Sequence, residues 1–211
     1  MFGQLEELRR RPIPVLDSSR IMKQGYRAWP IDDSADLHAD ALTHARDFNL
    51  WGRNYYAHAR NPPYWRAADG AIDALIMRRA VAERLALVDA RIEAFGLKVF
   101  LFDAWRPRAV QAYFHDVWMP AQVRTRHPDW DDAAVIAEVE RYWAAPSQSA
   151  ERPAPHATGG AVDITLVWDD GRPLWMGSLF DDASALSHTD RFERETEERS
   201  FSDEEARDNR R

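Results

Sequence analysis

The strongest periodic pattern in the chain covers residues 71–95, where apolar side chains recur at the spacing of one helix face. This face consists of Ile72, Leu75, Ile76, Leu85, Val88 and Ile92. Gly96 follows it, and glycine is the residue most often found just past a helix C-terminus. The pattern therefore predicts one long amphipathic helix over residues 71–95.

Two short apolar runs are typical of strands. Residues 97–102 (LKVFLF) are rich in branched and aromatic side chains, so we predict a buried strand that delivers Asp103, Trp105 and Arg106 at its end. The second run, AVDITLVW at residues 161–168, precedes the turn sequence DDGRP. The two glycines before this run would each cost a helix about 1 kcal/mol relative to alanine, which favours a loop that enters the strand.

Three further segments have helical patterns of unequal strength. A helix is predicted over residues 107–118, because its first residue is a proline, which favours the first helical position. Another is predicted over residues 131–143, with Asp131 near its N-terminal cap. Residues 35–51 show a weaker helical pattern.

The two ends of the chain differ in composition from its middle. Residues 1–35 contain Pro12, Pro14, Pro30 and Gly25 between short apolar pieces, which indicates an extended arm lying on the body. Residues 187–211 are dense in charge and alone could bury little apolar surface. At 211 residues and 45% hydrophobic, the chain is expected to form a single domain, residues 1–211, with residues 1–35 as an N-terminal arm.

Composition excludes several classes of function. The formal net charge of -7 gives no broad attraction to nucleic acid or anionic lipid, so we expect a small ligand. The lack of cysteine excludes disulfides, thiolate zinc sites and cysteine nucleophiles, so any metal needs His, Asp or Glu. The N-terminus is charged where a signal peptide needs an apolar run, and no window approaches a membrane span of about 18 apolar residues. A cytoplasmic protein without membrane contact is therefore expected.

The stretch HATGGAVD places two possible metal ligands, His156 and Asp163, on either side of a Gly-Gly pair. A strand edge can fix both side chains, the glycines let the backbone approach an ion closely, and an imidazole with a carboxylate suits zinc. Taken alone, such a pair is more often an exposed histidine and a turn-capping aspartate. Both readings stay open on spacing alone.

Arg106 and Asp181 are the other charged residues placed where function is common. Arg106 directly follows a predicted buried strand, where a fixed guanidinium could stabilise an oxyanion. The alternative, favoured for an isolated Arg-Pro, is a structural arginine that pairs with Asp103 or caps backbone carbonyls. Asp181, in MGSLFDD, is either a turn residue or an anchor for a substrate ammonium group.

Three motifs, FDAWRPRAVQAYF, HATGGAVDITL and MGSLFDDASALSHT, occur in the order and approximate spacing of those of one known family. The chain resembles the VanX-type D-alanyl-D-alanine dipeptidases, a branch of the zinc D-Ala-D-Ala metallopeptidases. The resemblance covers approximately residues 71–211. NLWGRNYY is also similar to the family's N-terminal segment.

The resemblance implies a compact α+β fold with a small antiparallel sheet, and a zinc-dependent hydrolysis of D-alanyl-D-alanine to free D-alanine. It further implies that His156 and Asp163 bind zinc, that Arg106 stabilises the developing oxyanion, and that Asp181 contacts the substrate's amino group. The substrate is then a small dipeptide, with a role in peptidoglycan precursor turnover or vancomycin resistance. Ala154 departs from the family, whose members often carry a substrate-binding serine two positions before the ligand histidine.

A Glu-x-x-His element near the C-terminus supplies the family's third zinc ligand and general base. None of the seven histidines here follows a glutamate by three positions. We therefore expect a C-terminally incomplete peptidase domain that is poorly active or inactive alone, because a glutamate base often contributes roughly 100- to 10,000-fold in rate.

Two other hypotheses fit the same motifs. One is a related cell-wall D,D-carboxypeptidase or endopeptidase with the same metal site, and the other is a truncated, non-catalytic relative. The sequence leaves the oligomeric state and the physiological dipeptide open.

Overall fold

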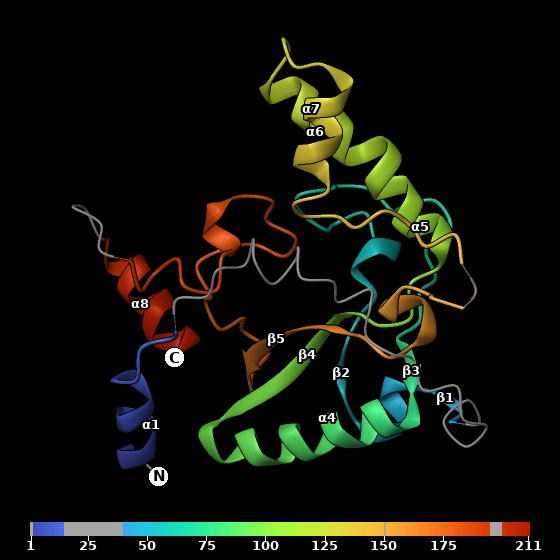
Figure 1. Cartoon of the computed structure of the whole chain (residues 1–211). Coiled ribbons are helices and arrows are strands. Elements are labelled where there is room, and N and C mark those ends of the chain that lie inside the picture. The colour runs from blue at the N-terminus through green and yellow to red at the C-terminus, as the bar shows by residue number, and fades with distance from the viewer. Residues whose placement is uncertain (1, 15–39, 150, 195–199) are drawn as a thin grey trace.

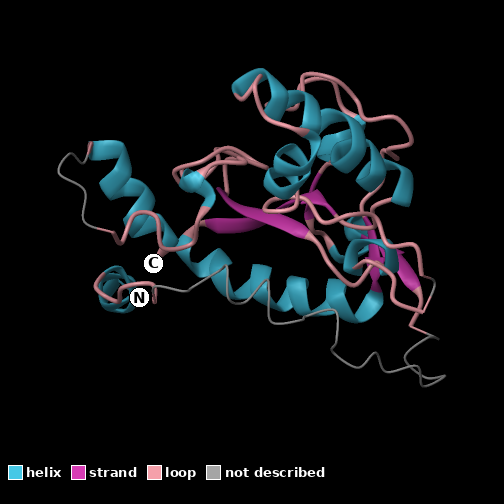
Figure 2. Ribbon diagram, turned by 45° about the horizontal axis from the view of Figure 1, so that its top comes forward, coloured by secondary structure: helices cyan, strands magenta, loops and turns pink. Residues whose placement is uncertain are grey.

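The computed structural model describes residues 2–14, 40–149, 151–194 and 200–211, and shows an α+β protein. Its centre is a small sheet, with the long helix α4 (Arg79–Ile92) on one side and α5 (Arg108–Tyr113), α6 (Met119–Arg126) and α7 (Asp132–Val139) on the other (Figures 1 and 2). The α+β fold implied by the family resemblance is confirmed.

The main sheet has three strands in the order β2, β4, β5. Strand β4 (Leu97–Asp103) lies in the middle, antiparallel to β5 (Asp163–Trp168) and parallel to the short β2 (Trp51–Gly52). Both predicted strands are therefore confirmed, although β2 makes the sheet mixed rather than purely antiparallel. Alternate residues of β4, namely Val99, Leu101 and Asp103, are completely buried, whereas the residues between them are partly exposed, so one face of the strand is more fully covered than the other.

The predicted helices over residues 71–95 and 35–51 need correction. A second, antiparallel sheet pairs β3 (Ile76–Arg78) with β1 (Leu42–His44), so α4 begins only at Arg79. Residues 45–48 form a 3-10 turn rather than part of an α-helix. Pairing with β1 buries Met77 of β3 completely and outweighs the helical periodicity.

The predicted stop at Gly96 is confirmed. A 3-10 turn (Glu93–Phe95) extends α4, and Gly96 follows it with a left-handed φ of 72°. The short connection then leads directly into β4.

The helical region between β4 and β5 also follows the predictions closely. A helix begins after Pro107, passes through a π-helical turn (Phe114–Trp118) and continues as α6. Asp131 caps α7, since its side chain accepts a hydrogen bond from the backbone N–H of Ala134. The α7 helix ends at Val139, earlier than predicted. An aromatic cluster beneath these helices forms the larger of two cores; its buried rings belong to Tyr56, Tyr64, Phe114 and Trp143.

The two ends of the chain meet. Helix α1 (Phe2–Arg9) lies beside α8 (Phe201–Arg210), and an ion pair of 2.6 Å joins Arg9 to Asp208 (Figures 1 and 2). The prediction of an extended arm was wrong for α1, because Glu6 forms ion pairs with Arg9 and Arg10 one turn away, which favours a helix. The remainder of the predicted arm, from residue 15 to residue 35, lies outside the described residues.

Candidate metal centre and its surroundings

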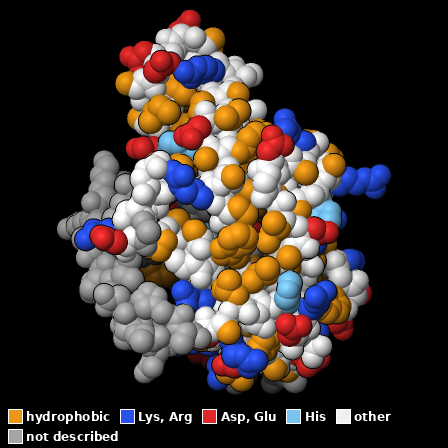
Figure 3. All heavy atoms as spheres, turned by 90° about the vertical axis from the view of Figure 1, so that its right-hand side faces the viewer, with side chains coloured by type: hydrophobic (Ala, Val, Ile, Leu, Met, Phe, Trp, Pro, Cys, Tyr) orange, Lys and Arg blue, Asp and Glu red, His pale blue; other side chains and the backbone are white. Residues whose placement is uncertain are grey.

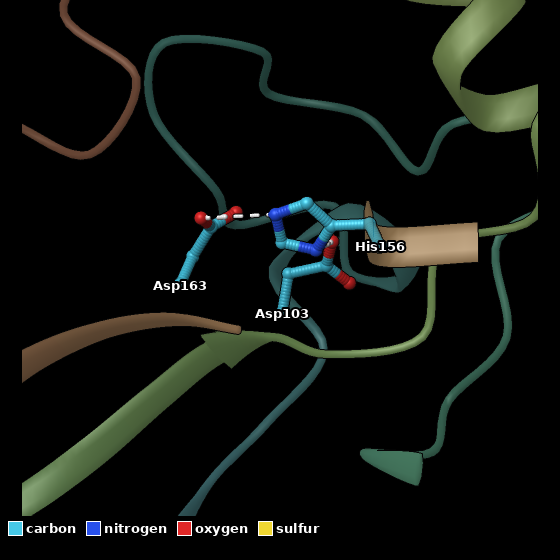
Figure 4. Close-up of side chains that lie close together, drawn as sticks. All are labelled: Asp103, His156 and Asp163. Carbon is cyan, nitrogen blue, oxygen red and sulfur yellow. Dashed lines mark ion pairs between the residues drawn. The ribbon is translucent and has the colours of Figure 1, made fainter. Parts of the chain in front are cut away.

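The antiparallel pairing of β4 and β5 brings two carboxylates together at one end of the sheet. Asp103 ends β4 and Asp163 begins β5, and the two residues are register partners. A β-bulge between Leu101 and Asp103 produces this alignment, because it leaves one residue of β4 unpaired. A 3-10 turn (Pro155–Thr158) places His156 beside both carboxylates (Figure 4).

Backbone contacts fix the turn that carries His156. The backbone N–H of Arg106 donates to the His156 carbonyl at 3.2 Å, and the Trp105 indole N–H donates to the Ala157 carbonyl at 2.9 Å. Trp105, which the sequence places at the end of the predicted strand, therefore holds this turn. Gly159 ends the turn with a φ of 71° and lies so close to the β1–β3 pair that a Cβ would be 2.8 Å from the Leu42 side chain of β1 and 3.3 Å from the Arg78 nitrogen of β3. The glycine permits close packing of two backbones.

The hydrogen bonds of His156 leave Nε2 available as a ligand. Nδ1 lies 2.9 Å from the Ala104 carbonyl oxygen, which can only accept, so Nδ1 carries the proton in the neutral ring. Nε2 then has a free lone pair and faces Asp163 Oδ1 at 3.4 Å (Figure 4). Burial alone would raise the pKa of Asp163, but the hydrogen bond from protonated His156 and the charge of Arg106 lower it below its usual value, which keeps this carboxylate ionised. Burial in turn lowers the pKa of His156, but the hydrogen bond and charge of Asp163, with the Ala104 carbonyl, raise it above its usual value, so a metal at Nε2 would take the place of a proton.

The spacing of this pair suits a zinc ion. Tetrahedral zinc with ligand bonds of about 2.0–2.1 Å separates two of its ligand atoms by roughly 3.3 Å. The observed 3.4 Å between His156 Nε2 and Asp163 Oδ1 agrees with that value without any rearrangement. The two residues expected from sequence to bind metal are therefore adjacent, at a separation that fits the ion.

Asp103 completes the one group of three possible ligands among the described residues, but its contacts indicate a different role. It lies at the Nδ1 edge of His156, with Oδ2 3.5 Å from that nitrogen. Its Oδ1 accepts from Asn54 Nδ2 at 3.2 Å, and its Oδ2 accepts from Arg106 Nε at 2.7 Å. Asp103 is completely buried and orients both His156 and Arg106.

Arg106 is 7% exposed and lies at the centre of the charged cluster. Besides the bond to Asp103, Nη1 donates to Gln111 at 2.9 Å and Nη2 donates to Asp163 at 2.6 Å. Its guanidinium also lies over the rings of Tyr56 and Trp143. The pairing with Asp103, the structural alternative from the sequence, is present. One positive and two negative charges leave this cluster with a net charge of -1, which favours a cation.

Asp181 lies at the hydroxyl end of Tyr56, one of these two rings. The hydroxyls of Tyr56 and Tyr64 both donate to its Oδ2 at 2.7 Å. Burial raises the pKa of Asp181 to about 6, and the charge of Asp163 adds to this effect. Asp181 lines a cavity of about 270 Å³ together with Trp143. An acidic group in a small cavity can bind a cationic group of a ligand.

Comparison with known proteins agrees with this geometry. The model of a family described as D-Ala-D-Ala dipeptidase matches residues 52–201. The chain belongs to this family. A D-alanyl-D-alanine dipeptidase of Synechocystis sp. is 36% identical over 121 residues, which are 53% of this chain and 47% of that relative. The alignment thus spans about half the length of the curated relative it matches.

The matched region of this D-Ala-D-Ala dipeptidase family member includes every candidate site residue named from the sequence. No helix within the described ranges is long and apolar enough to cross a membrane. On the face shown in Figure 3, acidic and basic side chains are interspersed among hydrophobic ones. Sequence reasoning missed Asn54, Tyr56 and Tyr64 as neighbours of the site. A signal existed for two of them, since Asn54 and Tyr56 lie within the family-like stretch NLWGRNYY.

Proposed function

We propose that this family member hydrolyses the dipeptide D-alanyl-D-alanine to free D-alanine at a zinc site formed by His156 Nε2 and Asp163 Oδ1. The observation that carries the proposal is the facing of these two atoms at 3.4 Å. Zinc bound there would polarise the scissile carbonyl and lower the pKa of water to about 7. A peptidase with a small substrate is what the family membership supports.

Arg106 and Asp181 bind the reacting dipeptide. Three of the five N–H donors of Arg106 are used by Asp103, Gln111 and Asp163, so two remain for the oxygen that gains charge in the transition state. Ionised Asp181, held by its two tyrosines, pairs with the substrate's ammonium group. Both roles depend on positions that the surrounding structure fixes before substrate binds.

Hydrolysis by the 211 residues alone is expected to be slow. Without the Glu-x-x-His glutamate, the attacking water has no dedicated proton acceptor, a role often worth roughly 100- to 10,000-fold. Two protein ligands also hold zinc more weakly than three. The cytoplasmic location and the role in vancomycin resistance stay predictions from the sequence.

Zinc content and D-alanine release test the proposal together. His156→Ala and Asp163→Ala should each lose bound zinc and the zinc-dependent release of D-alanine. His58→Ala is the matched control, because His58 pairs with Asp73 at the surface and should keep both properties. Equal zinc content in all variants would remove His156 and Asp163 as ligands. Zinc-loaded, folded protein that releases no D-alanine, even when an added small-molecule base can accept the proton of the attacking water, would refute the reaction but leave the metal site.

A further inference from the structure

A second cavity, of about 300 Å³, borders the candidate metal pair at His156, and its lining does not include Asp181. Arg106 and His156 form the part of its wall that belongs to the site. The remaining wall comes from the start of α5, from residues 146–149 and from residues 153–157. A substrate bound at the metal pair therefore has room to extend into this cavity.

The wall of this cavity is positively charged. Its described lining contains two arginines and one histidine but neither aspartate nor glutamate. Arg106 is neutralised by Asp103 and Asp163, but Arg108 forms no ion pair with a carboxylate among the residues that the structure describes. Arg108 instead donates from Nε to the Ser147 carbonyl at 2.8 Å, and from Nη2 to the Gln148 side-chain oxygen. The side chain is held in place while its charge stays uncompensated.

The cavity beside Asp181 has the opposite character. Its lining includes Asp181 and Asp182 but no described lysine or arginine. Arg106 connects the walls of the two cavities, because it lines the basic cavity and its guanidinium lies 5.1 Å from the ring of Trp143, which lines the acidic cavity. A zwitterionic ligand across the metal pair would therefore meet a negative group at one end and a positive group at the other.

We propose that Arg108, held by Ser147 and Gln148, binds the free C-terminal carboxylate of the dipeptide. This inference rests on the proposed function and assigns a direction to the substrate, with the ammonium group at Asp181 and the carboxylate at Arg108. Ala154 lines the same cavity and has no side-chain hydrogen bond to offer. Arginine binds carboxylates through paired N–H donors, and the described bonds of Arg108 leave Nη1 free to contribute.

Such an arrangement selects short substrates. A dipeptide presents both charged ends to the two cavities, whereas a chain blocked or extended at its C-terminus places a neutral group against Arg108. An endopeptidase substrate has neither charged end near the scissile bond and would leave both Asp181 and Arg108 without a partner.

Calorimetric titration of the metal-free 211-residue chain tests the carboxylate site without any hydrolysis. The probes are D-alanyl-D-alanine and its C-terminal amide, which differ only in the group that Arg108 is proposed to bind. The wild type should bind the free acid about 10- to 100-fold more tightly than the amide. Arg108→Gln should bind the acid as weakly as the amide, and Gln148→Ala should lose part of the preference.

Arg124→Gln is the matched control, because Arg124 is an exposed arginine that pairs with Asp132 away from the cavity. It should keep the wild-type preference. An Arg108→Gln protein with an unchanged preference, or a wild type that binds neither probe or does not distinguish them, would overturn the assignment. Thermal unfolding confirms that the variants fold. If Arg108→Gln loses the preference for the free acid but zinc-loaded wild type releases no D-alanine, the carboxylate site is supported and hydrolysis is refuted. If wild type releases D-alanine but does not prefer the free acid, hydrolysis is supported and the carboxylate site is refuted.

Discussion

At the scale of single residues, the site combines groups whose charges oppose one another. Arg106 neutralises part of the charge of Asp103 and Asp163, and tyrosine hydroxyls compensate Asp181. Partial compensation leaves a net negative charge that a cation, or the ammonium group of a substrate, can satisfy. Such sites lower the stability of the folded protein without their ligand.

Asp181→Asn should stabilise the protein at neutral pH while weakening dipeptide binding. The folded-state pKa of Asp181 is about 6, above its ordinary 3.8, so its contribution to stability is present below about pH 4 and lost as the pH rises through 6. Asparagine cannot ionise, so the variant avoids this loss of stability. Its side-chain oxygen still accepts the hydrogen bond from Tyr56, and asparagine tolerates the φ of 55° at this position. We expect a gain on the order of 1 kcal/mol, or about 2–4 °C in Tm, at pH 7.5.

Thermal unfolding at pH 4 and pH 7.5 checks this prediction. The stabilisation should be absent at pH 4, where Asp181 is already protonated. Asp182→Asn, at the neighbouring position in the same cavity, is the control and should leave Tm unchanged at both pH values. A variant that is less stable than wild type at pH 7.5 would contradict the assignment of an unfavourably ionised Asp181.

Asp103→Asn tests the orienting role of the buried carboxylate. The variant places an amide N–H₂ against either Arg106 Nε–H or the Asn54 amide, which opposes donor to donor. Loss of a group that orients a ligand histidine typically weakens metal binding about 10- to 100-fold. Zinc titration should show this decrease, while Asp73→Asn at the surface should bind zinc normally. Complete loss of zinc, as in His156→Ala, would instead make Asp103 a ligand.

At the scale of elements, the sequence predicts those segments whose signals are local. Strand β4, Gly96 and the cap at Asp131 follow from composition and capping over a few residues, and all three are present. Strand β3 could not be predicted, because its apolar residues also fit a helix and only pairing with the distant β1 decides between the two. The bulge in β4 that aligns Asp103 with Asp163 likewise depends on a strand sixty residues away.

Gly159→Ala should destabilise the protein and weaken zinc binding. A Cβ at this position would lie 2.8 Å from the Leu42 side chain and 3.3 Å from the Arg78 backbone nitrogen, and the φ of 71° is unfavourable for alanine. We expect a loss of about 1–2 kcal/mol from the backbone conformation, plus displacement of the turn that carries His156.

Gly171→Ala separates these two effects. Gly171 has a similar φ of 85°, but a Cβ there would meet nothing within 4 Å. Chemical denaturation should show a loss of stability for both variants, and zinc titration should show weaker binding for Gly159→Ala alone. Unchanged zinc affinity in Gly159→Ala would mean that the close approach to β3 does not position His156.

At the scale of the whole molecule, one strand connects the parts. Leu101 of β4 belongs to the core above α4, and Asp103 at the end of the same strand orients Arg106, whose guanidinium lies over Tyr56 and Trp143 of the aromatic core. Motions or unfolding of one core would therefore disturb the other, and a single folding unit is proposed.

Thermal unfolding should accordingly be one cooperative transition that zinc moves to higher temperature. Far-UV and near-UV circular dichroism should give the same Tm, and zinc at 100 times its Kd should add about 2.7 kcal/mol to the free energy of unfolding. His156→Ala should unfold cooperatively without a zinc-dependent shift. Two separate transitions would contradict a single domain, and a zinc shift in His156→Ala would place the metal elsewhere.

The segment that connects β4 to β5 bears on how the substrate preference of this protein can evolve. The chain leaves β4 and returns to β5 at the same end of the sheet, so residues 107–153 form an insert whose two ends are fixed beside the metal pair. This insert carries Arg108 and the stretch that holds it, whereas His156 and Asp163 follow it. Exchange of this continuous segment, by recombination in evolution or by grafting in the laboratory, would change the cavity at Arg108 while His156 and Asp163 stay in the chain. Because the segment also contributes Gln111 and Trp143 to the surroundings of Arg106, such an exchange must retain these two residues.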